Sequence, residues 1–235
     1  MFRIGPRAWS PTIRRRSGGA DVTSDGASAE RGAAVEWGAD WREADLAVLT
    51  LHGRGQDPEF MRATAARFGP APVRFHAPPA PGRTWYPRPF LDPVERNQPE
   101  LDRSLRTVEE CVRHLAELGF GPERLVLLGF SQGACLLSQY ALTSPARFAG
   151  LVLLTGGHII PDPFPAASGH PLLNVPVVMR SIENDPWVPR WRVEETAALL
   201  AERGASVDLR IDPGHEHIIT DEACHAATEV LNRRA

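Results

Sequence analysis

Short apolar runs alternate along this chain with stretches whose apolar residues recur every three or four positions. The first run, Leu46–Leu51, is continuous and short, which is typical of a strand buried on both faces of a sheet. Similar runs predict five further strands: Pro72–His76, Leu125–Leu128, Leu151–Leu154, Val175–Met179 and Val207–Ile211. A segment with helical spacing or a loop follows each run.

The clearest helical pattern covers residues 98–118, and Gly119 follows it as a residue suited to end a helix. Four other segments also predict helices: 58–68, Gln132–Leu142, 190–203 and 219–233. Strands separated by helices imply parallel βαβ units. The fold class is therefore α/β, with an open, mostly parallel sheet and helices on both of its faces.

The chain divides into an arm and one domain. Residues 1–35 are rich in Gly, Ser, Ala and Arg with little periodicity, so we expect a mobile N-terminal arm. Residues 36–235 are long and apolar enough to bury one substantial core, and we expect a single catalytic domain there. The connection between Thr155 and Val175 is about twenty residues, too short for a large helical cap.

Composition and charge exclude several classes of function. The formal net charge is −3, which provides no basic field for nucleic acid, and all 26 basic residues are arginines, which excludes lysine-amine chemistry. Three cysteines within apolar segments predict buried, reduced thiols. No run approaches the roughly 18 apolar residues of a membrane helix, and the N-terminus lacks a signal-peptide core. We therefore expect a cytoplasmic protein without stable membrane insertion.

The segment Gly129-Phe130-Ser131-Gln132-Gly133 lies between a predicted strand and a predicted helix. This is the setting of a nucleophile elbow, in which a serine projects above the edge of the sheet. A serine hydroxyl is a weak nucleophile at neutral pH, so it needs a base and an acid that orients the base. Ser131 is the candidate nucleophile of an α/β-hydrolase fold.

The acid and the base are expected downstream of Ser131, because α/β hydrolases have the chain order serine, acid, histidine. Asp185 follows one predicted strand, with Glu183 as a nearby rival, whereas Asp212 directly precedes Pro213-Gly214 and is interpreted as a turn former. For the base, spacing leaves His215 and His217 open. His52 and His158 also follow predicted strands.

An oxyanion needs donors that are fixed before it forms. The backbone N–H of Gln132, the residue after the nucleophile, is the first candidate. The second is the backbone N–H of Arg54, because the glycines on either side of it let that loop approach the site. Trp85, Tyr86 and Trp187 are aromatic loop residues that we expect to form apolar walls for the acyl group of a substrate.

Four segments resemble the phospholipase/carboxylesterase family of α/β hydrolases, which includes bacterial carboxylesterases and acyl-protein thioesterases. They are Leu51-His52-Gly53-Arg54-Gly55, residues 79–87, Gly129-Phe130-Ser131-Gln132-Gly133-Ala134, and Asp185-Pro186-Trp187-Val188-Pro189 with Pro213-Gly214-His215-Glu216-His217. The resemblance implies Asp185 as the acid in preference to Glu183. It also implies His217 as the base, three residues after Gly214. The chain departs from the family's Gly-Asp-x-Asp pattern in having Ile182-Glu183-Asn184-Asp185.

These observations predict a serine carboxylesterase that hydrolyses small to medium acyl esters through an acyl-enzyme intermediate, with thioesters and lysophospholipids as further candidate substrates. We expect no cofactor and no metal, and the expected partner is a small-molecule ester. The sequence leaves open whether the protein forms a homodimer. A metal-dependent hydrolase is the weaker alternative, because His215, Glu216, His217 and Asp185 lack a compact ligand spacing. A non-catalytic ligand-binding protein on the same fold is the other.

Overall fold

The computed structural model describes residues 32–160 and 169–233, so most of the predicted arm lies outside the described residues. The strands are β1 (Val35–Gly38), β2 (Leu46–Leu51), β3 (Val73–Ala77), β4 (Leu125–Phe130), β5 (Gly150–Leu154), β6 (Pro176–Ile182) and β7 (Ser206–Asp212). The α-helices are α1 (Pro58–Ala65), α2 (Glu100–Glu117), α3 (Gln132–Thr143), α4 (Arg190–Glu202) and α5 (Asp221–Leu231). Short 3₁₀ turns cover Pro81–Arg83, Val94–Asn97 and Pro122–Arg124.

The strands form one sheet in the order β1-β3-β2-β4-β5-β6-β7. All neighbouring pairs from β3 to β7 are parallel. The central strands β2, β4 and β5 are buried along their whole length, which explains their continuous apolar sequences. The predicted α/β class, with a mostly parallel sheet, is confirmed.

The edge strand β1 was not predicted, and it begins one residue inside the segment expected to be a mobile arm. It pairs antiparallel with β3, with Val35 opposite Ala77. Its four residues alternate between half-buried and exposed, so its sequence has no continuous apolar run. The indole of Trp37 stacks on Phe75 of β3 with ring centroids 4.9 Å apart. This cross-strand contact fastens β1 to the sheet.

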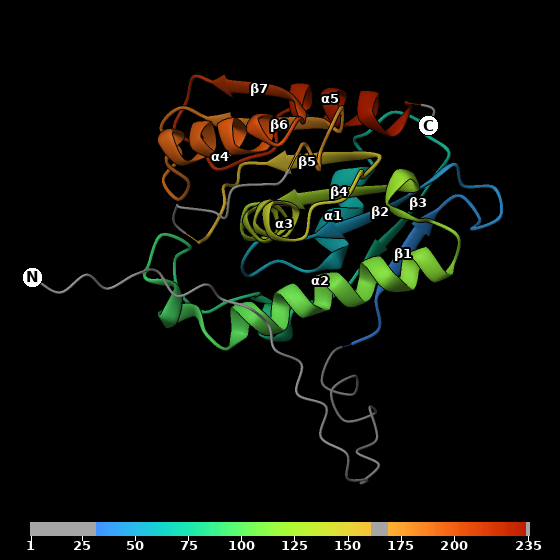
Figure 1. Ribbon diagram of the computed structural model, residues 1–235, viewed down its shortest axis with the longest axis horizontal. Coiled ribbons are helices and arrows are strands. Elements are labelled where there is room, and N and C mark those ends of the chain that lie inside the picture. Colours follow the sequence, from blue (N-terminus) through green and yellow to red (C-terminus); the bar gives the residue numbers. More distant parts are fainter. Residues whose placement is uncertain (1–31, 161–168, 234–235) are drawn as a thin grey trace, which may run out of the picture.

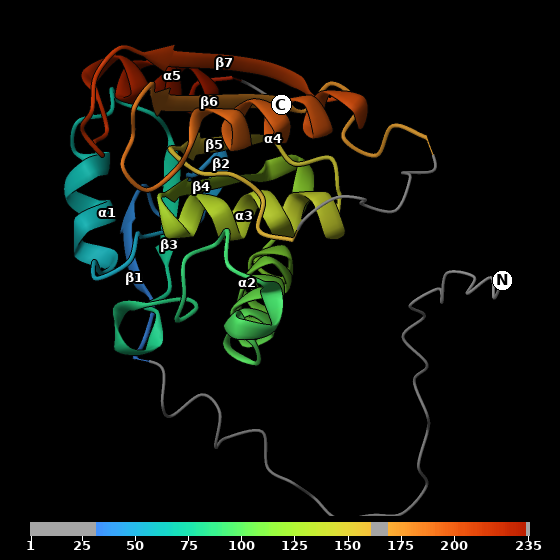
Figure 2. The same ribbon diagram turned by 90° about the vertical axis from the view of Figure 1, so that its left-hand side faces the viewer.

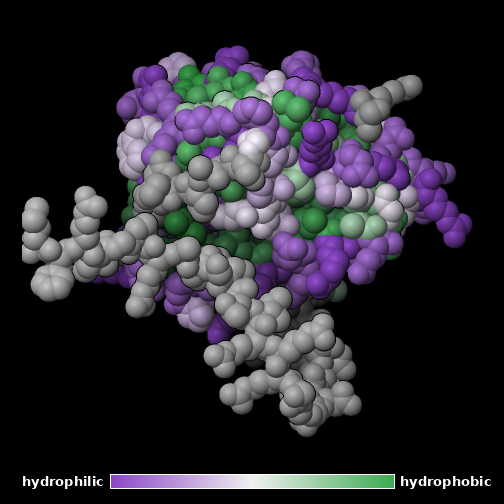
Figure 3. Space-filling view, in the orientation of Figure 1, coloured by the Kyte–Doolittle hydropathy of each residue, from purple (hydrophilic) through white to green (hydrophobic). Residues whose placement is uncertain are grey.

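Helices cover both faces of the sheet, as Figures 1 and 2 show. The buried apolar residues of α2, α3 and α4 belong to one core cluster, together with side chains from one face of the sheet. Those of α1 and α5 belong to a second cluster on the opposite face. The space-filling view shows apolar surface between polar patches on one face of the molecule (Figure 3). No helix among the described residues has the length and apolar character needed to span a bilayer.

The carboxyl ends of the parallel strands lie at one edge of the sheet, and the predicted site residues follow four of these ends. The loop with Arg54 follows β2, Ser131 follows β4, Asp185 follows β6 and His217 follows β7. In open α/β sheets this edge is where ligands bind. Of the connection expected to be too short for a cap, residues 161–168 lie outside the described residues.

Candidate active site

Ser131 occupies a strained turn between β4 and α3. Its backbone has φ 54° and ψ −119°, a conformation that non-glycine residues rarely adopt. Two hydrogen bonds hold the turn: the Ser131 N–H donates to the carbonyl of Leu154 at 3.0 Å, and the N–H of Cys135 donates to the carbonyl of Ser131 at 2.9 Å. The predicted serine therefore lies in a sharp turn between a strand and a helix, a geometry that is typical of a nucleophile elbow.

The two glycines of the elbow are required by close packing. A Cβ on Gly133 would lie 2.3 Å from the carbonyl oxygen of Leu51, and one on Gly129 would lie 2.7 Å from the backbone nitrogen of Ala134. Both distances are far below van der Waals contact. The glycines thus allow α3 to approach β2 and to turn directly out of β4, while Ser131 itself adopts the positive φ.

His217 connects Ser131 to Asp185. Its Nε2 lies 2.7 Å from Ser131 Oγ, and its Nδ1 lies 2.6 Å from Asp185 Oδ2. The second carboxylate oxygen of Asp185 accepts the N–H groups of Trp187 and Val188, both at 2.9 Å. The loop after β6 therefore fixes the carboxylate, and the carboxylate fixes the ring of His217.

The surroundings of Asp185 keep it ionised. Burial by itself would raise the pKa of this carboxyl group, but the hydrogen bonds from His217 and from the N–H groups of Trp187 and Val188 outweigh burial and lower the pKa. An ionised carboxylate can only accept hydrogen bonds. Nδ1 of His217 must then be the donor, and in the neutral imidazole Nε2 is left to accept the hydroxyl hydrogen of Ser131.

The other candidates for acid and base lie elsewhere. Glu183 forms an ion pair with Arg190 at 3.2 Å, and Asp212 forms one with Arg210 at 2.6 Å. The side chain of His215 is exposed, and its backbone N–H donates to Glu216. Within residues 32–160 and 169–233, no three His, Cys, Asp or Glu side chains gather as a metal-binding group.

Two further histidines after strands have local partners of their own. Nδ1 of His52 lies 2.8 Å from the carbonyl of Gly53, and its Nε2 accepts the N–H of Ala80 at 3.2 Å. This pattern requires the neutral ring, and burial lowers the pKa of His52. His158 is buried, with Nδ1 2.8 Å from Thr196 Oγ1 and Nε2 against the guanidinium of Arg192. These partners of the two rings are groups other than Ser131.

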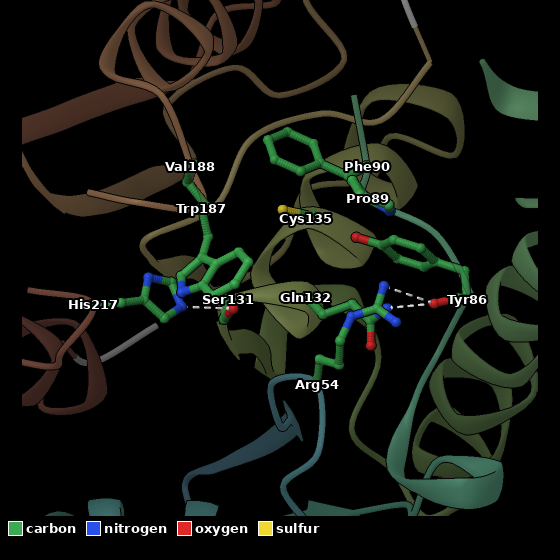
Figure 4. Close-up of a pocket in the computed structure, with 10 residues that line it drawn as sticks. All are labelled: Arg54, Tyr86, Pro89, Phe90, Ser131, Gln132, Cys135, Trp187, Val188 and His217. Atoms are coloured by element: carbon green, nitrogen blue, oxygen red, sulfur yellow. Dashed lines mark hydrogen bonds between the residues drawn. The ribbon is translucent and has the colours of Figure 1, made fainter. Parts of the chain in front are cut away.

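A cavity of about 500 Å³ opens beside Ser131 (Figure 4). Ser131 and His217 lie at one part of its wall, with Trp187 and Val188 near them. Across the cavity its wall consists of Tyr86, Pro89 and Phe90, with Cys135 between the two sides and Arg54 and Gln132 below. Apolar side chains thus surround the serine on two sides.

Of the three aromatic residues expected to form walls, Tyr86 and Trp187 line this cavity and Trp85 does not. The indole of Trp85 is only 1% exposed, and its Nε1–H donates to the carbonyl of His52 at 2.9 Å. The ring lies 5.2 Å from the imidazole of His52. Consecutive residues of the loop thus point in different directions: Tyr86 lines the cavity, whereas the expectation that Trp85 would be a substrate wall is wrong.

Several residues of the site were not predicted. Cys135 lies on α3, four positions after Ser131. This spacing places both residues on the same side of the helix, so the sequence could have identified Cys135 as a residue of the site. Phe90 and Pro89 lie in a proline-rich loop without any periodicity, and nothing in the sequence connects them to Ser131. The side chains of Arg54 and Gln132, singled out only for their backbone, also line the cavity.

A family model described as phospholipase/carboxylesterase matches residues 39–234, nearly the whole described part of the chain. The chain belongs to the phospholipase/carboxylesterase family. A Schizosaccharomyces pombe acyl-protein thioesterase 1 is 30% identical over 158 residues, which are 60% of this chain and 69% of the relative. A probable carboxylesterase of Oryza sativa subsp. japonica is 26% identical over 74% of this chain and 82% of its own length.

Solved structures agree with this membership. A phospholipase/carboxylesterase from Dyadobacter fermentans has a TM-score of 0.79 and 30% identity, covering 85% of this chain and 95% of that one. A carboxylesterase from Mesorhizobium loti has a TM-score of 0.66 and 25% identity, covering 80% of this chain and 89% of that one. This member of the phospholipase/carboxylesterase family therefore has the α/β-hydrolase fold and is a hydrolase of the esterase and thioesterase class.

Proposed function

We propose that this protein is a serine carboxylesterase that hydrolyses small to medium acyl esters through an acyl-enzyme intermediate. The observation that carries the proposal is the position of His217, within hydrogen-bond distance of Ser131 on one side and of Asp185 on the other. Thioesters and lysophospholipids share the acyl carbonyl that the mechanism attacks, so they belong to the same substrate class.

In the first step Ser131 Oγ attacks the ester carbonyl carbon while its proton passes to Nε2 of His217. The carbonyl oxygen takes up the negative charge and accepts the backbone N–H groups of Arg54 and Gln132. Among the described residues neither N–H has a protein acceptor, so both are available for this purpose. Asp185 stays ionised and stabilises the imidazolium that forms.

In the second step the tetrahedral intermediate collapses. The bond to the leaving alcohol or thiol breaks, and His217 returns the proton to the leaving atom. Water, activated by His217 in the same way, then releases the acid and regenerates Ser131. No metal or cofactor is needed for these two reaction steps.

The position of His217 also orients the substrate. The leaving atom must be within reach of Nε2, so the alcohol part lies on the side of His217 and Trp187 (Figure 4). The acyl part then extends across the cavity toward Tyr86 and Phe90. A cavity of about 500 Å³ suits an acyl chain of modest length.

Labelling with a fluorophosphonate tests the nucleophile. We expect one covalent adduct on Ser131 of the folded protein, identified by mass spectrometry, and no adduct in Ser131→Ala. Cys135→Ala, a change in the same cavity, should still label. Folded wild-type protein that stays unlabelled would exclude the serine mechanism and would favour a non-catalytic ligand-binding role.

A series of p-nitrophenyl esters from acetate to palmitate tests the substrate range. We expect kcat/KM to be highest between acetate and octanoate, because longer chains exceed the cavity. A maximum at palmitate would contradict the small-to-medium range while leaving the serine mechanism intact.

A further inference from the structure

Arg54 extends its side chain to the loop that carries Tyr86. Its Nη2 donates to the carbonyls of Tyr86 at 3.0 Å and Arg88 at 2.8 Å, and its Nη1 donates to the carbonyl of Pro87 at 2.9 Å. The guanidinium also lies 5.9 Å from the centre of the Tyr86 ring. Three consecutive carbonyls of residues 86–88 therefore converge on one cation. Figure 4 shows the bond to the carbonyl of Tyr86.

The side chain of Gln132 holds the adjoining part of the same loop. Its Oε1 accepts the backbone N–H of Trp85 at 2.9 Å and the hydroxyl of Thr84 at 3.2 Å. Its Nε2 donates to the carbonyl of Tyr86 at 2.7 Å. The carbonyl of Tyr86 thus accepts from both Arg54 and Gln132, so these two side chains share one anchor point.

The chemistry of the guanidinium suits this task. Arginine offers five N–H donors in a planar fork, which can bind several carbonyls at once, whereas a lysine ammonium concentrates its donors on one atom. Within residues 32–160 and 169–233, the Arg54 side chain has no carboxylate partner in an ion pair. The carbonyls of the loop are its acceptors.

We infer that Arg54 and Gln132 are positioning residues that join the acyl wall to the oxyanion donors. Each would contribute its backbone N–H to the oxyanion, and each uses its side chain to hold the loop that supplies Tyr86 and leads to Phe90. The inference rests on the proposed function. As a consequence, the position that binds the substrate carbonyl, at the two N–H groups, and the position that binds the acyl chain, at Tyr86 and Phe90, keep a fixed distance and orientation.

The test compares hexanoate with acetate as p-nitrophenyl esters. In the proposed orientation we expect the hexanoyl chain to reach Tyr86 and Phe90, and the acetyl group to be too short to do so. Arg54→Met keeps the backbone N–H and the aliphatic stem but removes three charged hydrogen bonds, so the hexanoate-to-acetate ratio of kcat/KM should fall roughly tenfold. The fall should arise mainly from a higher KM for hexanoate, since the wall binds the acyl chain in ground and transition states alike.

The variant Arg54→Lys keeps the positive charge but removes the planar fork of N–H donors. If the hydrogen bonds to residues 86–88 matter, Lys should resemble Met, because one ammonium cannot replace the donors of the fork. A Lys variant with the wild-type ratio would overturn the inference and would assign Arg54 a role through charge alone. Arg83→Met is the matched control: Arg83 is an exposed arginine of the preceding turn that pairs with Asp57, and its loss should not change the ratio.

Gln132→Met provides a second variant in case Arg54→Met does not fold. It should lower the hexanoate-to-acetate ratio in the same direction. Because both side chains hold the carbonyl of Tyr86, the double variant should lose less than the product of the two single effects. Independent, fully multiplicative effects would contradict the shared anchor.

Fluorophosphonate labelling of wild-type Ser131 distinguishes failure of the inference from failure of the proposed function. If wild type is labelled and hydrolyses both esters, but the folded Arg54→Met and Gln132→Met variants keep the wild-type ratio, only the positioning role is wrong. If wild type is not labelled, the serine mechanism itself is wrong, and the positioning role falls with it.

Discussion

Asp185 and His217 are 32 positions apart in the chain, yet Oδ2 of Asp185 and Nδ1 of His217 are separated by 2.6 Å. The hydrogen bond joins the loop after β6 to the loop after β7. These two strands are parallel neighbours, with Ile182 opposite Asp212 at their carboxyl ends. The sheet therefore brings the pair together, and the two backbone N–H groups that bind the other carboxylate oxygen set its direction.

The position of His217 predicts that it, and not His215, serves as the base. We expect His217→Ala to lower kcat/KM for p-nitrophenyl butyrate by at least about a thousandfold, because Ser131 loses its proton acceptor. His215→Ala should stay within about threefold of wild type, since that residue is exposed and does not line the cavity beside Ser131. The reverse order of effects would exchange the two roles. Circular dichroism of both variants checks that they are folded.

Asp185→Asn tests the orienting acid. The amide oxygen of Asn can still accept the N–H groups of residues 187 and 188, but its NH₂ group would face Nδ1 of His217 and favour a proton on Nε2. That tautomer cannot accept from Ser131, so kcat should fall roughly a thousandfold or more while the fold is kept. The comparison is Glu183→Gln, which removes only a surface ion pair with Arg190 and should leave kcat unchanged. Equal losses in the two variants would argue against Asp185.

The fold was largely predictable because its central strands are buried on both faces. Each of β2, β4 and β5 lies between parallel neighbours and under helices, so each has a continuous apolar sequence. The edge strand β1 has a four-residue alternating pattern, which also fits an irregular segment. Its pairing with β3 depends on a partner about forty residues later, which a local pattern cannot show.

The candidate site was predictable where chemistry is tied to local sequence. The elbow needs glycine at two fixed positions around Ser131 because the backbone is crowded there. The pattern Gly-x-Ser-x-Gly therefore identifies the turn from the sequence alone. His215 and His217 stand two residues apart in one loop, so only the three-dimensional path of that loop separates them. The side-chain bonds of Arg54 reach residues more than thirty positions away, and no local signal predicts them.

Cys135 should be a slow nucleophile although it lines the cavity. Burial raises the pKa of its thiol to about 11, because the effect of burial outweighs the hydrogen bond from the N–H of Gly157, which lowers the pKa. The thiolate is the reactive form, so at about pH 8 only about one molecule in a thousand would carry it. We expect negligible alkylation by iodoacetamide at that pH, and a rate that rises tenfold per pH unit up to about pH 11.

The control for this prediction is Cys135→Ala, which should remove the alkali-dependent adduct. Prior phosphonylation of Ser131 should also suppress it, because the reagent has to enter through the same cavity. Stoichiometric alkylation of the native protein near pH 7 would refute the raised pKa.

The raised pKa of Cys135 also makes the stability of the fold depend on pH. The folded thiol keeps its proton, whereas the thiol of the unfolded chain loses it above about pH 8.5. The free energy of unfolding should therefore fall as the pH rises from about 8.5 toward 11.

Trp187 should select the leaving group rather than the acyl group. Its indole lines the cavity on the side of His217 and is 71% exposed, so it can cover the alcohol part of an ester without closing the site. We expect Trp187→Ala to lower kcat/KM for 1-naphthyl butyrate about tenfold more than for ethyl butyrate, because the naphthyl ring loses an aromatic contact. Acyl-chain preference on a common alcohol should not change, since Tyr86 and Phe90 remain. Trp191 gives a matched control: it is also exposed, at 53%, but does not line the cavity, so Trp191→Ala should preserve both preferences. A change in acyl preference in Trp187→Ala would reverse the proposed orientation of the substrate.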